Sequence, residues 1–246
     1  FFGQFNMDSE IVQDQNVRKA IEMGIDKEGF CSVIMEGRGI PAKGAFPGSF
    51  SYGNDAVETV SYDPEEAKKL LEKSGWTDTD GDGYVDKDGQ KLTINWLTYP
   101  TRLEQPKLAE YAQATLKEIG IDVSVNNTSD HRTYAENGEF DVYVSSLTTA
   151  PTGDPEYFFS STVTGSKNYG NYQNDEVTKL TEQLHQTFDT DERGKLAVEL
   201  QQKILDDDAY FFVSHLNMGI VTKANVTGMA AHPCDYYEIT ADLDVQ

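Results

Sequence analysis

The chain has 246 residues, 38% of them hydrophobic, which is enough for one large core or two modest ones. Its 20 Lys and Arg against 42 Asp and Glu give a net charge of −22, which argues against nucleic acid and anionic membrane surfaces as partners. No apolar run approaches the ~20 residues of a membrane span, and the opening segment FFGQFNMDSE lacks both an initiating Met and the features of a secretory signal, so we expect a mature piece or an excised fragment.

Two helices are predicted near the start of the chain. The segment NVRKAIEMGI carries apolar residues near one helical face, namely Val17, Ala20, Ile21 and Met23. A second helix should begin at the N-cap residue Asp26 and stop at Gly37. Its apolar positions are Phe30, Val33 and Ile34.

A loop and a well-marked helix follow. Residues 37–54 are rich in Gly and Pro and have no periodicity, which is typical of an ordered surface loop. The next helix should be capped by Asp63, continue with Pro64 in its first turn and end at Gly75. Its buried stripe consists of Ala67, Leu70 and Leu71.

The segment DTDGDGYVDKDG, residues 78–89, has the oxygen-ligand spacing of a calcium loop. The expected ligands are Asp78, Asp80, Asp82, the backbone carbonyl of Tyr84, and Asp86. The bidentate Glu that should close such a loop is absent, because its position holds Gly89. The alternative is a polar hairpin whose Asp-Gly pairs supply turns with positive φ. Both interpretations stay open.

The middle of the chain predicts a βαβ unit. Residues 92–99 alternate as a strand, residues 108–120 form an amphipathic helix, and residues 121–125 alternate again, so the two strands should be parallel with a right-handed crossover. A third strand is expected over residues 140–147. Two helices follow, with apolar positions Val177, Leu180, Leu184 and Phe188 in the first and Leu196, Leu200 and Ile204 in the second. Residues 209–222 should then form one or two strands, which makes the fold class α/β with a mixed sheet flanked by helices.

The segment SSLTTAPTGDPEYFFSS, which follows the third strand, is the candidate ligand site. Ligands of open α/β sheets bind at the carboxyl ends of strands, where small residues let a ligand approach the protein backbone. The candidate residues are Thr148, Thr149, Ala150, Pro151, Asp154 and Glu156. Asp154 has two interpretations, as a cap for the following turn or as an acid that faces ligand cations. A plain connection between strand and helix is the alternative for the whole segment.

Catalytic motifs are absent from the sequence. It contains no GxSxG elbow, phosphate-binding loop or GxGxxG turn, although its many carboxylates leave a hydrolase with an acid pair open. The four histidines show no metal-ligand spacing. A disulfide between Cys31 and Cys234 is not expected, because nothing in the sequence brings them together.

Several segments, in matching order over nearly the whole chain, resemble the extracytoplasmic solute-binding proteins of the oligopeptide, dipeptide and nickel ABC importers. The segments that carry the resemblance are DQNVRKAIEMGIDKEGF, YDPEEAKKLLEKSGW, GDGYVDKDGQKLTINW, LKEIGIDV, FDVYV with GDPEYFF, and TDERGKLAVELQQKILDDDAYFFVSH. The resemblance implies one lobe of a type II periplasmic-binding-protein-like fold. It covers the carboxyl-terminal lobe only, residues 1–246, with residues 224–246 as a tail that returns towards a missing amino-terminal lobe.

The same resemblance implies a function without catalysis. Such proteins capture a solute outside the cytoplasmic membrane, as a cell-surface lipoprotein or in the periplasm, and deliver it to the membrane subunits of an ABC permease. No cofactor is required, and calcium in the aspartate-rich loop would brace a turn. The family's peptide-binding members have an Asp where this chain has Pro151, and its nickel-binding members have a His where this chain has Glu156. A peptide ligand is preferred, with a nickel or other metal chelate as the alternative. A calcium-braced extracellular adhesion module is a further alternative from another class of protein.

Overall fold

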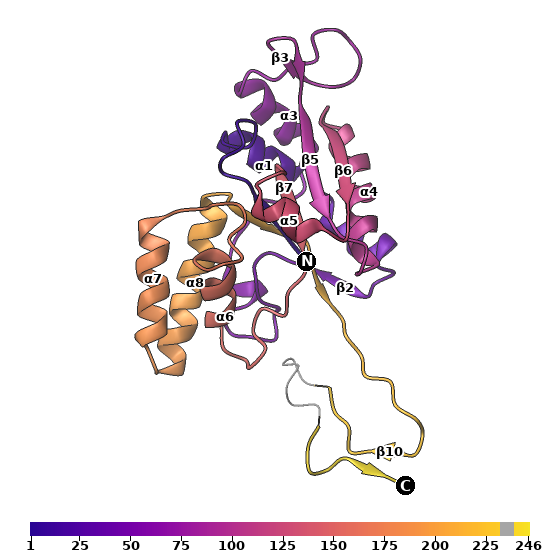
Figure 1. The fold of residues 1–246 in the computed structure, drawn as a ribbon, viewed down its shortest axis with the longest axis vertical. Coiled ribbons are helices and arrows are strands. Elements are labelled where there is room, and N and C mark those ends of the chain that lie inside the picture. The colour runs from indigo at the N-terminus through magenta and orange to yellow at the C-terminus, as the bar shows by residue number, and fades with distance from the viewer. Residues whose placement is uncertain (232–238) are drawn as a thin grey trace.

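The computed structural model describes residues 1–231 and 239–246, and its centre is a five-stranded sheet (Figure 1). The strand order is β6-β5-β7-β1-β8. These strands are β1 (Phe2–Phe5), β5 (Thr93–Thr98), β6 (Asp122–Asn127), β7 (Val142–Ser145) and β8 (Tyr210–Phe212). Strand β5 runs parallel to β6 and β7, whereas β1 runs antiparallel to β7 and β8. The sheet is therefore mixed, as the sequence predicts.

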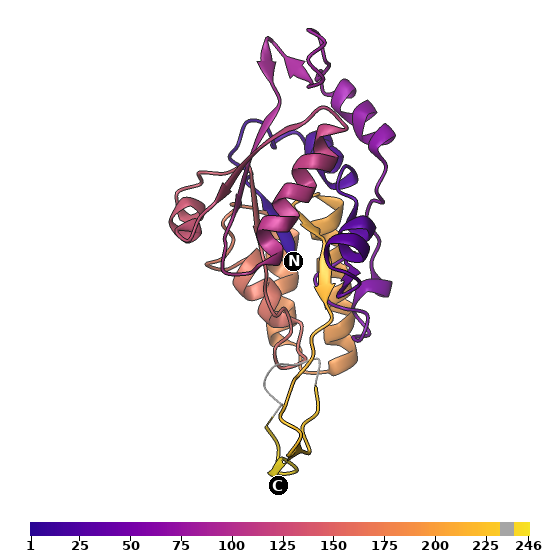
Figure 2. The same cartoon turned by 90° about the vertical axis from the view of Figure 1, so that its right-hand side faces the viewer.

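The helices surround this sheet (Figures 1 and 2). They are α1 (Gln15–Met23), α2 (Lys27–Gly29), α3 (Pro64–Lys73), α4 (Glu104–Lys117), α5 (His131–Glu136), α6 (Glu156–Phe158), α7 (Asp175–Gln186) and α8 (Thr190–Asp206). Two π-helical turns, η1 (Phe30–Ile34) and η3 (Phe159–Val163), continue α2 and α6, and η2 (Asn54–Ala56) is a 3₁₀ turn. Small antiparallel pairs join β2 (Gly39–Pro41) to β9 (Ser214–Leu216), β3 (Asp86–Lys87) to β4 (Gln90–Lys91), and β10 (Val226–Thr227) to β11 (Asp244–Val245).

Side-chain caps fix where several helices begin. The carboxylate of Asp26 accepts the backbone N–H of Gly29, and that of Asp63 accepts the N–H of Glu66. In α8 the cap is Asp189, which accepts the N–H groups of Asp191 and Glu192. Each cap satisfies N–H groups that the first helical turn leaves without partners. The helix starts expected at Asp26 and Asp63 are confirmed.

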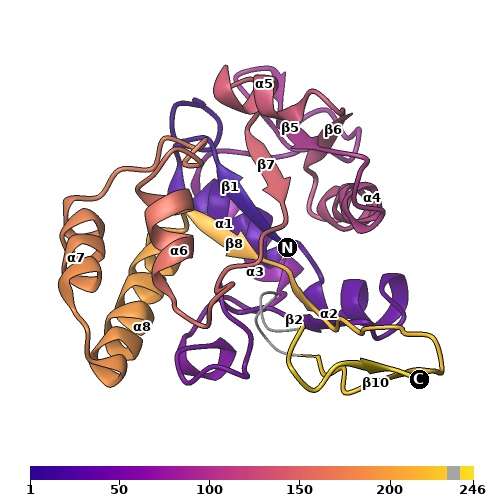
Figure 3. The ribbon, with the colours of Figure 1, turned by 60° about the horizontal axis from the view of Figure 1, so that its bottom comes forward.

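The two faces of the sheet support separate cores. Buried residues of β5, such as Trp96, pack with α1, α3 and α4 in the first core. Buried residues of β1 and β8, such as Phe2 and Phe212, pack with α6, α7 and α8 in the second. Alternation along β1 sends Phe5 to the first core and Phe2 to the second, as the two-residue period of a strand requires. Figure 3 shows α7 and α8 on one side of the molecule and α4 on the other.

One strand was missed, and two expectations about the fold were wrong. The missed strand, β1, opens the chain and occupies an interior place in the sheet. Residues 37–54 do not lie only on the surface, because Ala42, Ala45 and Phe46 are buried in the second core. Phe188 is 93% exposed, because α7 ends at Gln186 before it could place Phe188 on its buried face.

Beyond β9, residues 217–231 leave the body of the molecule in an extended path (Figure 1). Residues 217–231 and 239–246 carry exposed apolar side chains, among them Met218, Val221 and Ile239. His232 and Cys234 lie outside the described residues, so the expectation about a disulfide stays a prediction. Within the described ranges, none of the helices combines the length and the apolar character needed to cross a membrane.

Candidate functional site

The carboxyl ends of β5, β6 and β7 meet at one edge of the sheet, because these strands run parallel. The strands end at Thr98, Asn127 and Ser145. The connection after β7 leaves from this edge, as the sequence predicts for a ligand-binding loop of an α/β protein. We call residues 146–156 the edge loop.

The edge loop is tied to the second core by side-chain hydrogen bonds. Thr149 donates its hydroxyl to the carbonyl of Ala45 at 2.8 Å, and Tyr52 donates to the carbonyl of Gly153 at 2.8 Å. Between these ties, the N–H of Gly153 bonds to the carbonyl of Ala150 at 3.0 Å and closes a turn. The φ of +81° at Gly153 favours glycine there. The loop is therefore held in a defined shape.

The structure places the predicted residues of this loop in different environments. Thr148 is exposed, whereas Thr149 and Pro151 are half-buried. Ala150 is buried within the second core, so its side chain serves packing.

Arg193 of α8 binds both carboxylates of the edge loop. Its Nε and Nη2 donate to the two oxygens of Asp154 at 2.8 and 2.7 Å, and Nη2 also donates to Glu156 at 2.9 Å. Asp154 additionally accepts the N–H of Glu156, which is the capping contact of its first interpretation. His185 of α7 contacts the other oxygen of Glu156 at 2.6 Å.

Arg193 contacts the carboxylates of the edge loop and also carbonyl groups at the carboxyl end of α7. Partial burial opposes ionisation of Glu156, but hydrogen bonds from His185 and Arg193 outweigh it and hold the pKa of Glu156 below its ordinary value. Arg193 also donates Nη1 to the carbonyls of Leu184 and Thr187, both at 2.6 Å, at the carboxyl end of α7. One guanidinium thus joins the edge loop, α7 and α8.

A cluster of aromatic rings lies beside the edge loop. The imidazole of His131, the first residue of α5, stacks on Tyr99 with ring centroids 4.2 Å apart. His131 Nδ1 is 2.7 Å from the hydroxyl of Tyr143, whose ring meets Tyr169 edge-on at 5.6 Å. The hydroxyl of Tyr99 accepts the backbone N–H of Ser146 at 3.2 Å, which connects the cluster to the edge loop.

Sequence reasoning missed Arg193 and this aromatic cluster. Arg193, Tyr99 and Tyr143 lie far apart in the chain and in no recognisable motif. His131 could have been found from its position shortly after the predicted strand of residues 121–125, because ligands bind at the carboxyl ends of parallel strands.

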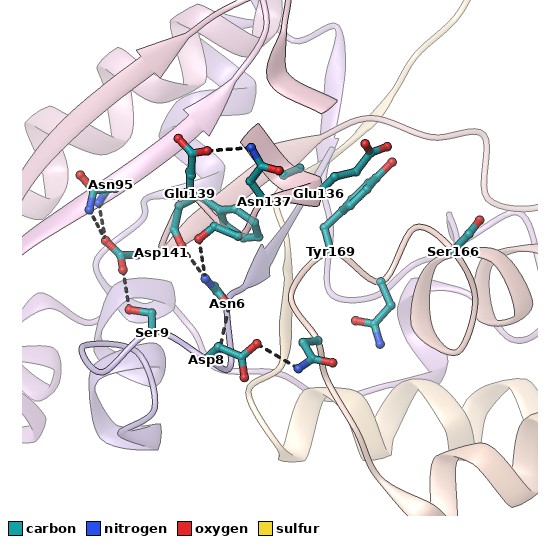
Figure 4. A pocket seen from close by; sticks show the side chains of 15 residues that line it. Asn6, Asp8, Ser9, Asn95, Glu136, Asn137, Glu139, Asp141, Ser166 and Tyr169 are labelled. Carbon is teal, nitrogen blue, oxygen red and sulfur yellow. Dashed lines mark hydrogen bonds between the residues drawn. The ribbon is translucent and has the colours of Figure 1, made fainter. Parts of the chain in front are cut away.

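An open pocket of about 750 Å³ lies at the opposite end of β7, where that strand begins and β1 ends (Figure 4). Its lining comes from the turn after β1, the end of α5 and the loop of residues 166–171. Asp141 accepts hydrogen bonds from the hydroxyl of Ser9 and from the backbone and side-chain nitrogens of Asn95 (Figure 4). The side-chain nitrogen of Asn171 donates to Asp8. These bonds connect the turn after β1 to β5, to the start of β7 and to the loop of residues 166–171.

The aspartate-rich loop contains a compact group of carboxylates. One oxygen each from Asp78, Asp80 and Asp86 lies within 4.8 Å of the others, which is a spacing that a cation could bridge. Asp82 does not join them, because it pairs with Lys91 at 2.8 Å. The ring of Tyr84 lies beneath the same lysine, 4.0 Å from Nζ to the ring centroid.

A hairpin turn follows these carboxylates. Asp88 and Gly89 have φ values of +54° and +77° between β3 and β4, so this end of the segment is a hairpin with a positive-φ Asp-Gly turn, and calcium binding by the segment stays a prediction.

Residues 1–170 match the family model of the bacterial extracellular solute-binding proteins, family 5, middle part. The oligopeptide-binding protein AppA of Bacillus subtilis is 31% identical over 247 residues, covering 96% of this chain and 45% of the relative. The nickel-binding periplasmic protein of Escherichia coli is 28% identical over 226 residues, covering 88% of this chain and 43% of the relative. The chain therefore spans less than half the length of these curated relatives.

The fold agrees with these sequence matches. The structure of AppA from Bacillus subtilis in complex with a nonapeptide superimposes with a TM-score of 0.78 and 26% identity, over 94% of this chain and 47% of the other. Because this superposition covers nearly the whole chain, the two structures are alike across both cores.

Proposed function

The chain belongs to the bacterial extracellular solute-binding proteins of family 5, and on this premise we propose that it forms part of the substrate-binding component of an ABC importer. In this role it captures a peptide-like solute outside the cytoplasmic membrane and delivers it to the membrane subunits of the permease, without catalysing a reaction. The observation that carries the proposal is the edge loop, which is braced at the carboxyl edge of parallel strands by Thr149, Tyr52 and Arg193.

The edge loop favours an extended peptide over a metal chelate. We infer that an extended peptide lies along residues 148–149 as a strand-like partner, a mode of recognition that uses main-chain hydrogen bonds. Asp154 and Glu156 are already bound by Arg193, so they form part of the loop's support. A nickel or other metal chelate is the second candidate, and the nickel-binding relative motivates it.

We infer that residues 1–246 form the carboxyl-terminal lobe of a two-lobe protein. Support comes from the chain's spanning less than half the length of its relatives. In this arrangement the tail, residues 224–246, contacts an amino-terminal lobe, and the solute lies between the lobes. The protein works as a cell-surface lipoprotein or in the periplasm.

The test uses the full-length protein with a pool of nonapeptides and, separately, with nickel–histidine. The wild type should bind members of the peptide pool. Thr149→Pro should weaken that binding more than tenfold, because proline removes a backbone donor and fixes φ. Thr149→Val is the matched control and should change it less than threefold. Binding of nickel–histidine with no peptide binding would replace the leading proposal by the metal-chelate one.

A further inference from the structure

We propose that His131 binds an acceptor oxygen of the solute by donating a hydrogen bond from Nε2. Tyr143 fixes the imidazole of His131 in the tautomer that this hydrogen bond requires. The inference rests on the proposed function, because it places the solute at the carboxyl edge of β5, β6 and β7. It goes further in naming a side chain and the chemistry that it recognises, a carbonyl or carboxylate oxygen.

His131 is held in a fixed position beside the edge loop. It follows β6 by a short turn and lies half-buried against Tyr99, which is itself only 8% exposed. The stacked rings are nearly parallel, with 28° between their planes. Tyr99 in turn accepts the N–H of Ser146 in the edge loop. The imidazole is thus fixed beside the loop that we assign to the solute.

The two ring nitrogens of His131 differ in their surroundings. Nδ1 is engaged by the hydroxyl of Tyr143 at 2.7 Å. Nε2 has no protein partner in the described part of the chain and is not enclosed by it, so it remains available to a ligand. A histidine with one ring nitrogen hydrogen-bonded to the protein and the other accessible can form one directed hydrogen bond to a ligand.

Tyr143 decides which nitrogen carries the proton. The tyrosine is 3% exposed, and within residues 1–231 and 239–246 its hydroxyl makes no hydrogen bond other than that to His131. If Nδ1 carried the proton, the buried O–H of Tyr143 would lack an acceptor, which is unfavourable. The favoured arrangement has Tyr143 donating to Nδ1, so the imidazole proton lies on Nε2.

Both groups keep this arrangement at neutral pH. Burial and the neighbouring charge of Arg132 lower the pKa of His131, so the imidazole stays neutral. Burial, followed by the influence of Tyr99 and Tyr169, raises the pKa of Tyr143, so its hydroxyl keeps its proton.

The fixed tautomer selects the class of ligand. An Nε2–H group donates to carbonyl and carboxylate oxygens, which a peptide-like solute offers along its length. A metal ion binds the free lone pair of an imidazole nitrogen, and in this tautomer Nε2 has no free lone pair because it carries the proton. His131 therefore favours peptide oxygens and does not ligate a metal in this state.

The experiment combines nitrogen NMR of the histidine side chains with binding measurements on the full-length protein. In the wild type, His131 should show a protonated Nε2 and an unprotonated Nδ1, and His131→Gln identifies its signals by removing them. Tyr143→Phe should mix the two tautomers. A wild-type signal with the proton on Nδ1 would overturn the inference.

Binding of the nonapeptide pool and of free Ni²⁺ completes the test. His131→Ala should weaken peptide binding about three- to tenfold, the usual worth of one neutral hydrogen bond. His131→Gln, which keeps an N–H donor, should recover part of this loss, and Val33→Ala, remote and 70% exposed, should change nothing. Unchanged peptide binding in His131→Ala would overturn the inference while the proposed function stands.

The remaining outcomes are equally decisive. A tenfold loss of Ni²⁺ affinity in His131→Ala would show a metal ligand and overturn the assignment of a hydrogen-bond donor. A wild type that binds no peptide would overturn the proposed function and, with it, the peptide oxygen assigned to His131.

Discussion

Replacing Arg193 by Lys should destabilise the protein while keeping the positive charge. The guanidinium makes hydrogen bonds to Asp154, to Glu156 and to the carbonyls of Leu184 and Thr187. A lysine ammonium has three donors on one atom and cannot reproduce this planar fork. It could keep contact with one carboxylate and would leave the end of α7 without its donor.

The magnitude follows from burial. The Arg193 side chain is 13% exposed, but those of Asp154 and Glu156 are 41% and 25% exposed, so solvent weakens the ion pairs. Allowing for this screening, we expect a loss of about 2 kcal/mol in the free energy of unfolding. For a chain of this size, that corresponds to a fall of roughly 4–8 °C in the melting temperature.

The loss should also depend on pH. Because the native contacts lower the pKa of Glu156, their stabilising effect is present above its ordinary value of 4.5 and disappears as pH falls through the lowered native pKa. The difference between the wild type and Arg193→Lys should therefore shrink in acid. Urea unfolding followed by circular dichroism at pH 7 and about pH 3 measures it.

Arg38→Lys is the matched control. Its side chain is 67% exposed and pairs with an exposed Glu36 at 3.4 Å, so the same substitution should change stability by less than about 0.5 kcal/mol. If Arg193→Lys cost no more than Arg38→Lys, or if its effect did not change with pH, the network around Arg193 would not support the edge loop as we argue.

Three further predictions concern other parts of the chain. Burial raises the pKa of Asp208 to about 6 from 3.8, so its charge destabilises the native state increasingly as pH rises through this range. Asp208→Asn should raise the free energy of unfolding by about 1–2 kcal/mol at pH 7.5 and by almost nothing at pH 4, and equal effects at both pH values in urea unfolding would contradict this. Thr149→Val should cost about 1 kcal/mol in the same assay, because the carbonyl of Ala45 loses its donor, and no change would show that this tie is unimportant. If calcium braces the aspartate-rich loop with a Kd of about 10⁻⁴ M, then 1 mM calcium should stabilise the protein by about 1.4 kcal/mol, and Asp80→Ala should abolish this gain in thermal unfolding without affecting solute binding.

Local signals in the sequence predicted the parts of the fold that depend on near neighbours. The cap Asp63 and the following Pro64 indicated the start of α3 correctly, because both act within one helical turn. The parallel unit formed by β5, α4 and β6 was also predictable, since its apolar pattern changes from a period of two to one of 3.6 and back. The edge at which the candidate site lies follows from this unit alone.

Long-range contacts explain what the sequence could not predict. Strand β1 is short and contains Gly3, a weak strand former, yet a Cβ atom at Gly3 would lie 2.1 Å from the ring of Phe211. Only the folded sheet reveals this requirement. Similarly, no spacing indicated that Arg193 binds Asp154, which is 39 positions away, or that Ala45 and Phe46 enter a core.

The interior position of β1 imposes an order on folding. Its neighbours are β7 and β8, so Phe2 pairs with Ser145 on one side and with Phe212 on the other. The unit of β5, α4, β6 and β7 is contiguous and can assemble early, and β1 can pair with β7, but β1 is paired on both sides only when β8, the last of the five strands, joins the sheet. Until then, the edge of β1 that faces β8 offers unpaired backbone groups to other chains. We expect variants that weaken β8 to aggregate during refolding before they lose measurable native stability.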